Sequence, residues 1–575
     1  MPRFAAVLAP GRAEARAHLD ALGATGPTED PAGLVPAEPG HATAPFTVAG
    51  RTAVGEVTLH NRAVLFDALA ARRTPAPDGC PDGELLVRAW LGLGERGIRL
   101  AEGMFALAVL DGDDLVLIRD HVGARTLYYA RAAGAWAASS SLRALRRWPA
   151  LDTGLNLPAV RSFLTFAYLP GEKTLLRGVY EVLPGRILRL RGDGTAGAAV
   201  FWEPREESGD EHRDRPAELR LLLEQATARR LPDAEPVAVL LSGGVDSSLV
   251  TALAAKLHTH PVHTYSISFG RELPNELGYS GLVAAHCQTG HRVLDVSGED
   301  VASRLADAAA LLDSPVGDPL TVPNLLLAEA VAADSHRVVL NGEGGDPVFG
   351  GPKNLPMLVH EQHRAATGEG EPRSTAYLRS YRKCWADLPD LLTRDALRAL
   401  ADAPRPERFV EPYLEGPDRM SLLLNQLLHC NLRTKGAHHI LTKVERLTAS
   451  QGLQGRSPLF DRRVVDHAFA TPPALKLRGT VEKWVLKEAV RDLLPDTVVD
   501  RPKSGMRVPV QQWLTGPLRD LAGELLLGAA ARRRGLFRPA AVRTWMRGEG
   551  SVLPRQGGKL WLVLTLELWL RAYDL

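Results

Sequence analysis

The sequence predicts an α/β protein with two domains, the first rich in antiparallel β-structure and the second built on a doubly wound parallel sheet. Three observations lead to this fold class. Short alternating apolar segments with turn residues between them fill the chain up to about residue 203. Beyond residue 217, β-branched segments alternate with Ala- and Leu-rich helical stretches, as in a parallel sheet with crossover helices. Between them, Glu203–Pro216 has the charged composition of a solvated linker.

The first domain, residues 1–203, is predicted from paired strand signals. Phe105–Leu110 and Leu115–Arg119 are apolar runs separated by a turn that contains Asp111 and Gly112, and Leu127–Tyr129 continues the pattern. Such runs indicate hairpins in an antiparallel sheet.

The second domain, residues 217–575, is predicted from strands that are each flanked by helical stretches. These strands are Val237–Leu241, Val262–Phe269, Arg292–Val296 and Arg337–Asn341. From about Pro372 onward the pattern is mostly helical, although the Gly-, Pro- and charge-rich segment Phe349–Ser374 is expected to be a mobile loop. Ligands of such sheets bind beyond the carboxyl ends of the strands, so the residues that follow the strands are the site candidates.

Composition narrows the function classes. The 69 basic and 67 acidic residues leave a net charge of +2, which gives no signal for nucleic-acid binding. The cysteines are Cys80, Cys287, Cys384 and Cys430, and their wide spacing argues against a zinc site and against a disulfide framework. We therefore expect a cytoplasmic protein without a secretory signal. The apolar tract Leu560–Leu570 is too short to span a membrane and is expected to form a buried helix.

The loop after the first strand of the second domain carries the strongest motif. It contains the residues Ser242, Gly243, Gly244, Asp246, Ser247 and Ser248. The glycines permit close backbone approach, and the amide groups at the start of the following helix, together with the serine hydroxyls, can hold a polyphosphate. Asp246 is then expected to be a magnesium ligand. The alternative is a Gly-rich turn without a ligand.

A second Gly-rich turn follows the strand that ends near Asn341. It contains Gly342, Glu343 and Asp346, so it offers carboxylates next to a backbone that can approach a nucleotide closely. Asp346 is expected to complete the magnesium site with Asp246. Taken alone, the turn could also be an acidic surface turn.

Together these motifs resemble those of the asparagine synthetase family, whose nucleotide loop has the pattern SGGxDSS of the ATP pyrophosphatases. Further matching segments include Gly103–Asp111, Arg119-Asp120-x-x-Gly123, Tyr168–Thr174, Leu441–Arg446, Gly455–Asp461, Glu482-Lys483, Arg501–Gly505 and Leu566–Arg571. The resemblance implies an N-terminal αββα sandwich of the Ntn type, like a glutamine amidotransferase, and a C-terminal ATP pyrophosphatase domain with added helices. The implied activity is the AMP-forming, ATP-dependent synthesis of an amide bond.

The resemblance also implies roles for single residues. Lys503 matches the family lysine that neutralises charge as the amine attacks, and Glu343 is the candidate base or orienting group for the attacking amine. Leu240, Ile267 and Gly342 would frame the adenine by analogy. Lys443 is a further catalytic candidate, although Lys443, Glu445 and Arg446 together are assigned first to an ion-paired structural role and second to pyrophosphate or substrate contact.

Departures from the family pattern direct the functional prediction. Glutaminases of this family begin Met-Cys-Gly, whereas this sequence begins Met1-Pro2-Arg3, so the amidotransferase-like domain is expected to be inactive. The β-lactam synthetases, which also lack the cysteine, have a tyrosine where this chain has Glu343. The chain further has Pro347 where many relatives have glutamate. In these features the chain is most similar to the lasso peptide cyclases.

The resulting hypothesis is an enzyme that adenylates an Asp or Glu side chain of a leader-cleaved core peptide and closes a macrolactam with the peptide's N-terminal amine. Its expected cofactors are ATP and Mg²⁺. Its expected partners are the precursor core peptide, a leader peptidase and a leader-recognition protein encoded nearby. Two alternatives stay open: an ammonia-dependent asparagine synthetase-like or other small-molecule amide ligase, including a β-lactam synthetase-like enzyme, and a degenerate family member that only binds or regulates.

Overall fold

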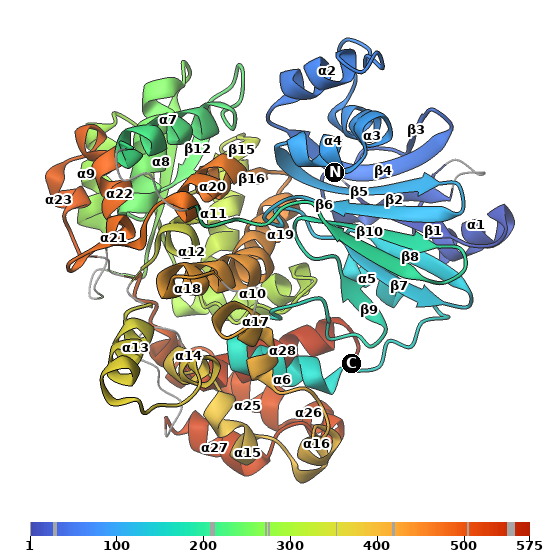
Figure 1. The fold of residues 1–575 in the computed structure, drawn as a ribbon. Helices are drawn as coiled ribbons and strands as arrows, with labels where there is room; N and C mark the ends of the chain where they lie inside the picture. The colour runs from blue at the N-terminus through green and yellow to red at the C-terminus, as the bar shows by residue number, and fades with distance from the viewer. Residues whose placement is uncertain are drawn as a thin grey trace. The chain divides into compact units, whose positions relative to one another are not determined.

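The computed structural model describes residues 2–26, 31–207, 213–270, 273, 276–351, 354–416, 420–502, 505–548 and 558–575 (Figure 1). Contacts divide the chain into two units. The first unit contains residues 1–156, 171–203 and 440–452, and the second contains 157–170, 204–439 and 453–575. Residues 157–170 thus group with the second unit, although the sequence placed them in the first domain. Residues 440–452 group with the first unit, although the sequence placed them in the second domain.

The first unit is built on two antiparallel sheets. One sheet has the strand order β2-β1-β8-β7-β9, and the other has the order β11-β10-β6-β5-β4-β3. The strands are β1 (Pro2–Leu8), β2 (Ala32–Pro39), β3 (Phe46–Val48), β4 (Arg51–Leu59), β5 (Gly103–Asp111), β6 (Asp114–Arg119), β7 (Tyr128–Ala132), β8 (Ala135–Ser139), β9 (Val179–Glu181), β10 (Arg186–Arg191) and β11 (Ala196–Val200).

The two sheets share one apolar core, and helices cover their outer faces. Phe4 from β1 and Leu117 from β6 belong to this core, to which both sheets contribute. On one side, α1 (Arg12–Ala21) contacts β1 and α5 (Leu142–Arg146) contacts β8 (Figure 1). On the other side, α3 (Asp82–Leu93) contacts β4, and α2 (Arg62–Ala70) and α4 (Glu95–Leu100) pack against α3. This is the αββα sandwich that the sequence predicted.

The second unit contains a parallel sheet with the strand order β14-β13-β12-β15-β16. The strands are β12 (Val237–Leu240), β13 (Val262–Ser268), β14 (Gly290–Asp295), β15 (Val338–Leu340) and β16 (Gln454–Arg456). The first four lie within two residues of the predicted strands. The sequence did not predict β16, because its Gln-Gly-Arg sequence has no apolar pattern.

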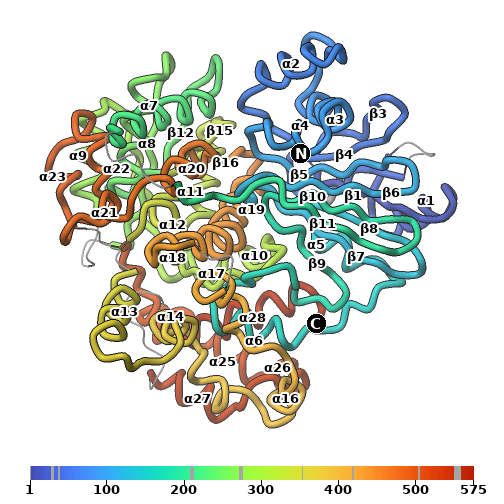
Figure 2. Tube along the Cα trace, in the orientation of Figure 1, coloured from blue at the N-terminus to red at the C-terminus, as the bar shows by residue number. Residues whose placement is uncertain are grey.

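Helices surround this sheet and extend beyond it (Figure 2). Those between the strands are α8 (Val245–Leu257), α9 (Leu277–His286), α10 (Gly298–Leu311) and α11 (Thr321–Ala333), and α7 (Arg215–Ala228) packs against α8. The longer of the remaining elements are α6 (Leu157–Phe166), α13 (Leu355–Thr367), α14 (Arg373–Tyr381), α18 (Leu423–Asn431), the π-helix η4 (Leu432–Leu441), α20 (Arg462–Ala470), α25 (Arg519–Leu527), α27 (Pro539–Met546) and α28 (Lys559–Ala572). The expected buried C-terminal helix is α28, in which Trp561 and Trp569 are buried. Among the residues described, no helix is long and apolar enough to cross a membrane.

The expected mobile loop Phe349–Ser374 is wrong in its central part, where helix α13 lies. Pro356 stands in the first turn of α13, and Gly368 follows its end in a left-handed conformation with φ +70°. Proline and glycine at these two positions delimit a helix, so the composition that suggested a loop in fact marks helix ends. Residues 352–353 lie outside the described part of the chain.

The turn after β6 is organised around the buried carboxylate of Asp120. Its Oδ1 accepts hydrogen bonds from the backbone N–H groups of Gly123 at 2.8 Å and Ala124 at 2.9 Å, and its Oδ2 accepts one from Arg125 at 3.0 Å. Further N–H groups of Phe105 and Val122 point to the same carboxylate. The motif Arg119-Asp120-x-x-Gly123 is therefore explained by backbone hydrogen bonding.

We predict that Asp120→Asn destabilises the first unit by about 2–3 kcal/mol, because an amide directs a donor at N–H groups that need an acceptor. Chemical denaturation followed by circular dichroism measures the loss. Asp113→Asn is the matched control, because Asp113 is exposed in the turn between β5 and β6. Equal denaturation midpoints for the two variants would contradict this account.

Candidate active site

The two Gly-rich turns lie where the strand order of the parallel sheet reverses. The first follows β12 and the second follows β15, and these strands are neighbours in the sheet. The chain leaves β12 toward β13 on its other side, so the carboxyl ends of β12 and β15 flank the switch point at which open α/β sheets bind ligands. The prediction that both turns share one sheet edge is confirmed.

The turns approach each other so closely that only glycine fits. A Cβ atom on Gly342 would clash with the backbone N of Ser247, and one on Gly345 would clash with the Asp246 carboxylate. Gly243, at φ +77°, likewise leaves no room for a side chain beside Ser280. The glycines of both motifs are therefore required by packing at this edge.

The carboxylates of the two turns meet at one ammonium group. Lys483 Nζ lies 2.6 Å from Asp246 Oδ2 and 2.6 Å from Asp346 Oδ1. Lys483 is buried and precedes helix α22 (Trp484–Ala489) in a left-handed conformation with φ +55°, which is strained for a residue with a side chain. Strain of this kind is common at functional sites.

Sequence reasoning missed the part that Lys483 plays at this site. It noted Glu482-Lys483 as a matching segment, but it did not count Lys483 among the site residues. Its partner Asp246 is 237 residues away in the chain, so no local pattern could reveal the pairing.

The serine hydroxyls of the first loop help to hold its shape. Ser242 N–H donates to Ser247 Oγ at 3.1 Å, and Ser247 Oγ donates to Gly244 O at 3.2 Å. Gly244 precedes helix α8 and has no side chain to cap it, so the first amide groups of α8 can receive an anion. Ser248 is fully buried, and its hydroxyl has no hydrogen-bond partner among the described residues.

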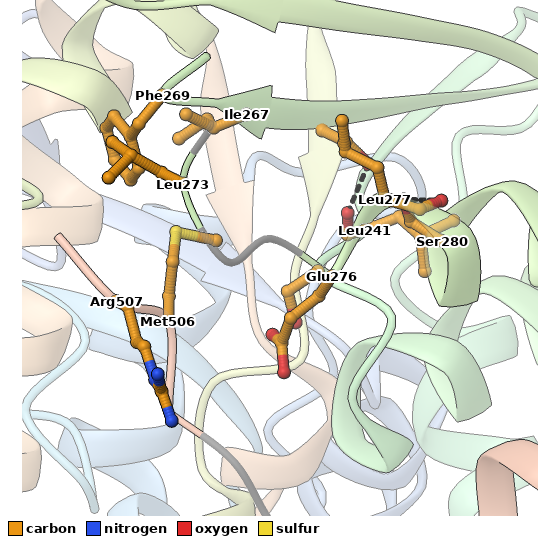
Figure 3. A pocket seen from close by; sticks show the side chains of 11 residues that line it. Leu241, Ile267, Phe269, Leu273, Glu276, Leu277, Ser280, Met506 and Arg507 are labelled. Carbon is orange, nitrogen blue, oxygen red and sulfur yellow. Dashed lines mark hydrogen bonds between the residues drawn. The ribbon is translucent and has the colours of Figure 1, made fainter. Parts of the chain in front are cut away.

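A pocket opens beside the first loop (Figure 3). Ile267, Phe269 and Leu273 form an apolar group, Met506 lies near them, and Glu276 and Arg507 are the charged lining residues. The other lining residues are Leu241, Ser242, Ser266, Leu277 and Ser280. Of the residues expected to frame adenine, Ile267 lines this pocket, whereas Leu240 and Gly342 are not among its lining residues.

The segment that contains Lys503 passes this pocket. Lys503 itself lies outside the described residues. Before it, Arg501 donates a hydrogen bond from NH1 to Gly243 O at 3.1 Å and forms an ion pair with Glu276. After it, Met506 and Arg507 line the pocket. The catalytic role of Lys503 thus stays a prediction, with its chain neighbours at the nucleotide loop.

Glu343 is held in the second turn by its backbone. Its N–H donates to Asn341 Oδ1 at 3.1 Å, and the same oxygen accepts a hydrogen bond from Ser457 Oγ at 2.8 Å. The described residues provide no hydrogen bond or ion pair to the partly exposed Glu343 carboxylate. It is therefore available to a substrate, as a general base must be.

The segment Lys443–Arg446 lies on helix α19 (Thr442–Ser450), which belongs to the first unit. Glu445 Oε1 accepts a hydrogen bond from Arg3 NH1 at 2.7 Å, and Arg446 NH2 donates to Ser140 O at 2.7 Å. Burial alone would raise the pKa of Glu445, but the guanidinium groups of Arg446 and Arg3 outweigh it and lower that pKa. These contacts are those of the ion-paired structural role, while the catalytic role of Lys443, which is also buried, stays a prediction.

Within the described part of the chain, no group of three or more His, Cys, Asp and Glu side chains gathers as a metal site. Asp246 and Asp346 are two carboxylates converging on one cation, however, and that number fits Mg²⁺, which is typically held by one or two carboxylates together with substrate phosphates.

Comparison with known proteins gives two family matches. The asparagine synthase family matches residues 218–571, and the glutamine amidotransferase domain matches residues 54–202. Among curated proteins, carboxyethyl-arginine beta-lactam-synthase of Streptomyces clavuligerus is 29% identical over 80% of this chain and 74% of its own. The glutamine-hydrolysing asparagine synthetase 1 of Bacillus subtilis is 23% identical over 85% of this chain and 80% of its own.

The first of these matches covers more than half of the chain and includes both Gly-rich turns, Lys483 and the segment around Lys503. The chain therefore belongs to the asparagine synthase family of ATP-dependent, amide-bond-forming ligases.

Proposed function

We propose that this ligase adenylates a carboxylate of its substrate and joins it to an amine that the substrate itself supplies. The observation that carries the proposal is the meeting of Asp246, Asp346 and Lys483 beside a helix start and a pocket at the switch point of the sheet. More specifically, we propose a lasso peptide cyclase, in which carboxylate and amine belong to one leader-cleaved core peptide and the product is a macrolactam.

The nucleotide would bind along the first loop. The first amide groups of α8 have no side-chain cap, and the hydroxyls of Ser242 and Ser247 lie 3.0 Å apart at this end of the helix, so these groups would bind the phosphates. Two carboxylates alone would repel a triphosphate. Mg²⁺ held by Asp246 and Asp346 would neutralise the phosphate charge and orient the leaving pyrophosphate, with Lys483 as a further cation.

The chemistry then follows in two steps. A carboxylate oxygen of the substrate attacks the α-phosphorus, the bond between the α- and β-phosphates breaks, and pyrophosphate leaves. The amine nitrogen next attacks the acyl carbon, and the bond to AMP breaks. The amine must lose a proton to attack, and Glu343 is the proposed acceptor. We propose that Lys503 and Lys443 stabilise the charge on the leaving adenylate.

The first unit supplies no suitable nucleophile to release ammonia from glutamine. Cys80 is the only cysteine in residues 1–203, and it is buried. Burial raises the pKa of its thiol, which disfavours the thiolate that would have to attack. Strand β1 carries Pro2 and Arg3, and the Arg3 guanidinium is occupied by ion pairs with Glu56 and Glu445. These observations support an amine that comes from the substrate itself or from free solution rather than from glutamine.

The main alternative is an ammonia-dependent ligase of a small molecule. Glu343 favours an asparagine synthetase-like ligase, because a glutamate at this position resembles the arrangement in those enzymes. A β-lactam synthetase-like enzyme is disfavoured on the same ground, because those enzymes have tyrosine at this position. A leader peptidase and a leader-recognition protein are proposed as partners only under the cyclase hypothesis.

Mass spectrometry distinguishes these functions. The enzyme is incubated with ATP, Mg²⁺ and the core peptide encoded beside its gene, with and without the neighbouring protease. We expect a product lighter than the peptide by one water, together with AMP. An unchanged peptide, with asparagine and AMP formed from aspartate and ammonium, would instead establish the alternative. Glutamine in place of ammonium should yield no glutamate in either case.

We further predict that Lys483→Met lowers turnover about 100-fold or more, because an electrostatic contact to the reacting phosphates is lost. The variant should also unfold at a lower temperature, since Asp246 and Asp346 lose an ion-pair partner that they share, and added Mg²⁺ should restore part of that loss. Turnover and thermal unfolding with and without Mg²⁺ measure both effects. Lys256→Met is the control, because Lys256 is exposed at the other end of α8. Wild-type turnover in Lys483→Met would contradict the assignment.

A further inference from the structure

The first unit contains a cluster of buried charges whose purpose its own fold does not explain. Arg3 is 1% exposed, and its NH1 donates to Glu56 Oε1 at 3.1 Å and to Glu445 Oε1 at 2.7 Å. Glu56 is 0% exposed and Glu445 is 2% exposed. The sandwich already has an apolar core shared by its two sheets, and burying charges is costly unless they are paired.

The surrounding residues are arranged to admit the Arg3 side chain. A Cβ atom on Gly40 would lie 2.7 Å from Arg3 Cδ and 2.9 Å from Arg3 Nε, so only glycine leaves room there. Arg3 Nε donates to Pro39 O at 2.6 Å, and His41 N–H donates to Glu56 Oε2 at 3.2 Å. Strand β1, the end of β2 and strand β4 thus all contribute to one socket for a guanidinium group.

Helix α19 fits onto this socket through two consecutive residues. Glu445 meets Arg3, while Arg446 NH2 donates to Ser140 O at 2.7 Å and also to the Thr126 hydroxyl. Ser140 in turn is tied to strand β1, since its N–H donates to Phe4 O at 3.2 Å. In Figure 2, α19 accordingly lies beside strands of the first unit that are far from it in sequence.

The segment that is held in this way is the one that carries Lys443. Residues 440–452 belong to the first unit by their contacts, although the chain before and after them belongs to the second. The chain then continues into β16, and Ser457 beyond it donates to Asn341 in the turn of Glu343. A shift of α19 would therefore displace Lys443.

We propose that Arg3 is a positioning residue of the ligase. Its guanidinium, shared between Glu56 and Glu445, fixes helix α19 to the sandwich and so holds Lys443 in place for the reaction. The amidotransferase-like unit serves as a support for this helix. The proposal rests on the proposed ligase function, and specifically on the role of Lys443 and the adjoining turn.

Two Arg3 variants of the full-length protein test it. Arg3→Lys keeps the charge, whereas Arg3→Met leaves Glu56 and Glu445 without their shared cation. We expect Arg3→Met to lower turnover about 10-fold or more, since a misplacement of about 1 Å can cost about 100-fold. The ATP concentration at half-saturation should change less than about 2-fold, because the nucleotide contacts lie in the second unit. Arg3→Lys should recover most of the turnover.

Arg119→Met is the matched control for lost stability. Arg119 is also fully buried and pairs with Glu181 at 2.6 Å in the same unit, and its other hydrogen bonds among the described residues go to the backbone oxygens of Arg125, Val182 and Gly123 and not to α19. Turnover is compared at a temperature at which all variants are folded by circular dichroism. If Arg3→Met loses no more turnover than Arg119→Met, Arg3 is only structural and the proposal is wrong.

Amide hydrogen exchange separates this proposal from the proposed function. Arg3→Met should speed exchange in residues 442–450 of α19, whereas Arg119→Met should leave that segment protected. Unchanged exchange in Arg3→Met would overturn the proposal whatever the enzyme's substrate. Faster exchange together with a wild-type enzyme that forms no amide would instead refute the proposed function and leave Arg3 as the anchor of α19.

Discussion

Asp246 and Asp346 converge on one ammonium group, that of Lys483, whose Nζ lies 2.6 Å from an oxygen of each carboxylate. Two carboxylates brought to one point repel each other, and a cation between them offsets that repulsion. The topology of the parallel sheet brings the two turns to one edge, and Gly342 and Gly345 permit their contact. Lys483 supplies the cation, at the expense of a strained backbone. Asp246 belongs to the nucleotide loop, and Ser242 of the same loop lines the pocket.

The first unit contains a comparable arrangement with a different outcome. There, Arg3 lies between Glu56 and Glu445, again one cation between two carboxylates. The difference is exposure. The Asp346 side chain is 39% exposed, so a ligand can reach it, whereas the side chains of Glu56 and Glu445 are at most 1% exposed. The same arrangement of charges therefore stands at a candidate ligand site in one unit and in the buried interior of the other.

Local patterns in the sequence were sufficient for four strands of the parallel sheet, for three strand segments of the first unit and for the two Gly-rich turns. Apolar β-branched runs are short-range signals, and a Gly-rich turn that follows such a run is recognised from a few neighbouring residues. The polar strand β16 gave no such signal, and helix α13 was hidden by the proline and glycine that delimit it. The pairing of Lys483 with Asp246 and of Arg3 with Glu445 could not be predicted, because the tertiary fold alone brings together residues that are 237 and 442 positions apart in the chain.

The central claim is that a substrate carboxylate attacks the α-phosphorus of ATP at the site of Asp246, Asp346 and Lys483. Oxygen-18 transfer tests this claim most directly. The substrate carboxylate is labelled with oxygen-18, the reaction is run to completion with Mg²⁺, and the nucleotide products are analysed by mass spectrometry. The account predicts AMP that carries one labelled oxygen and pyrophosphate that carries none. Unlabelled AMP, or ADP with labelled phosphate, would contradict it.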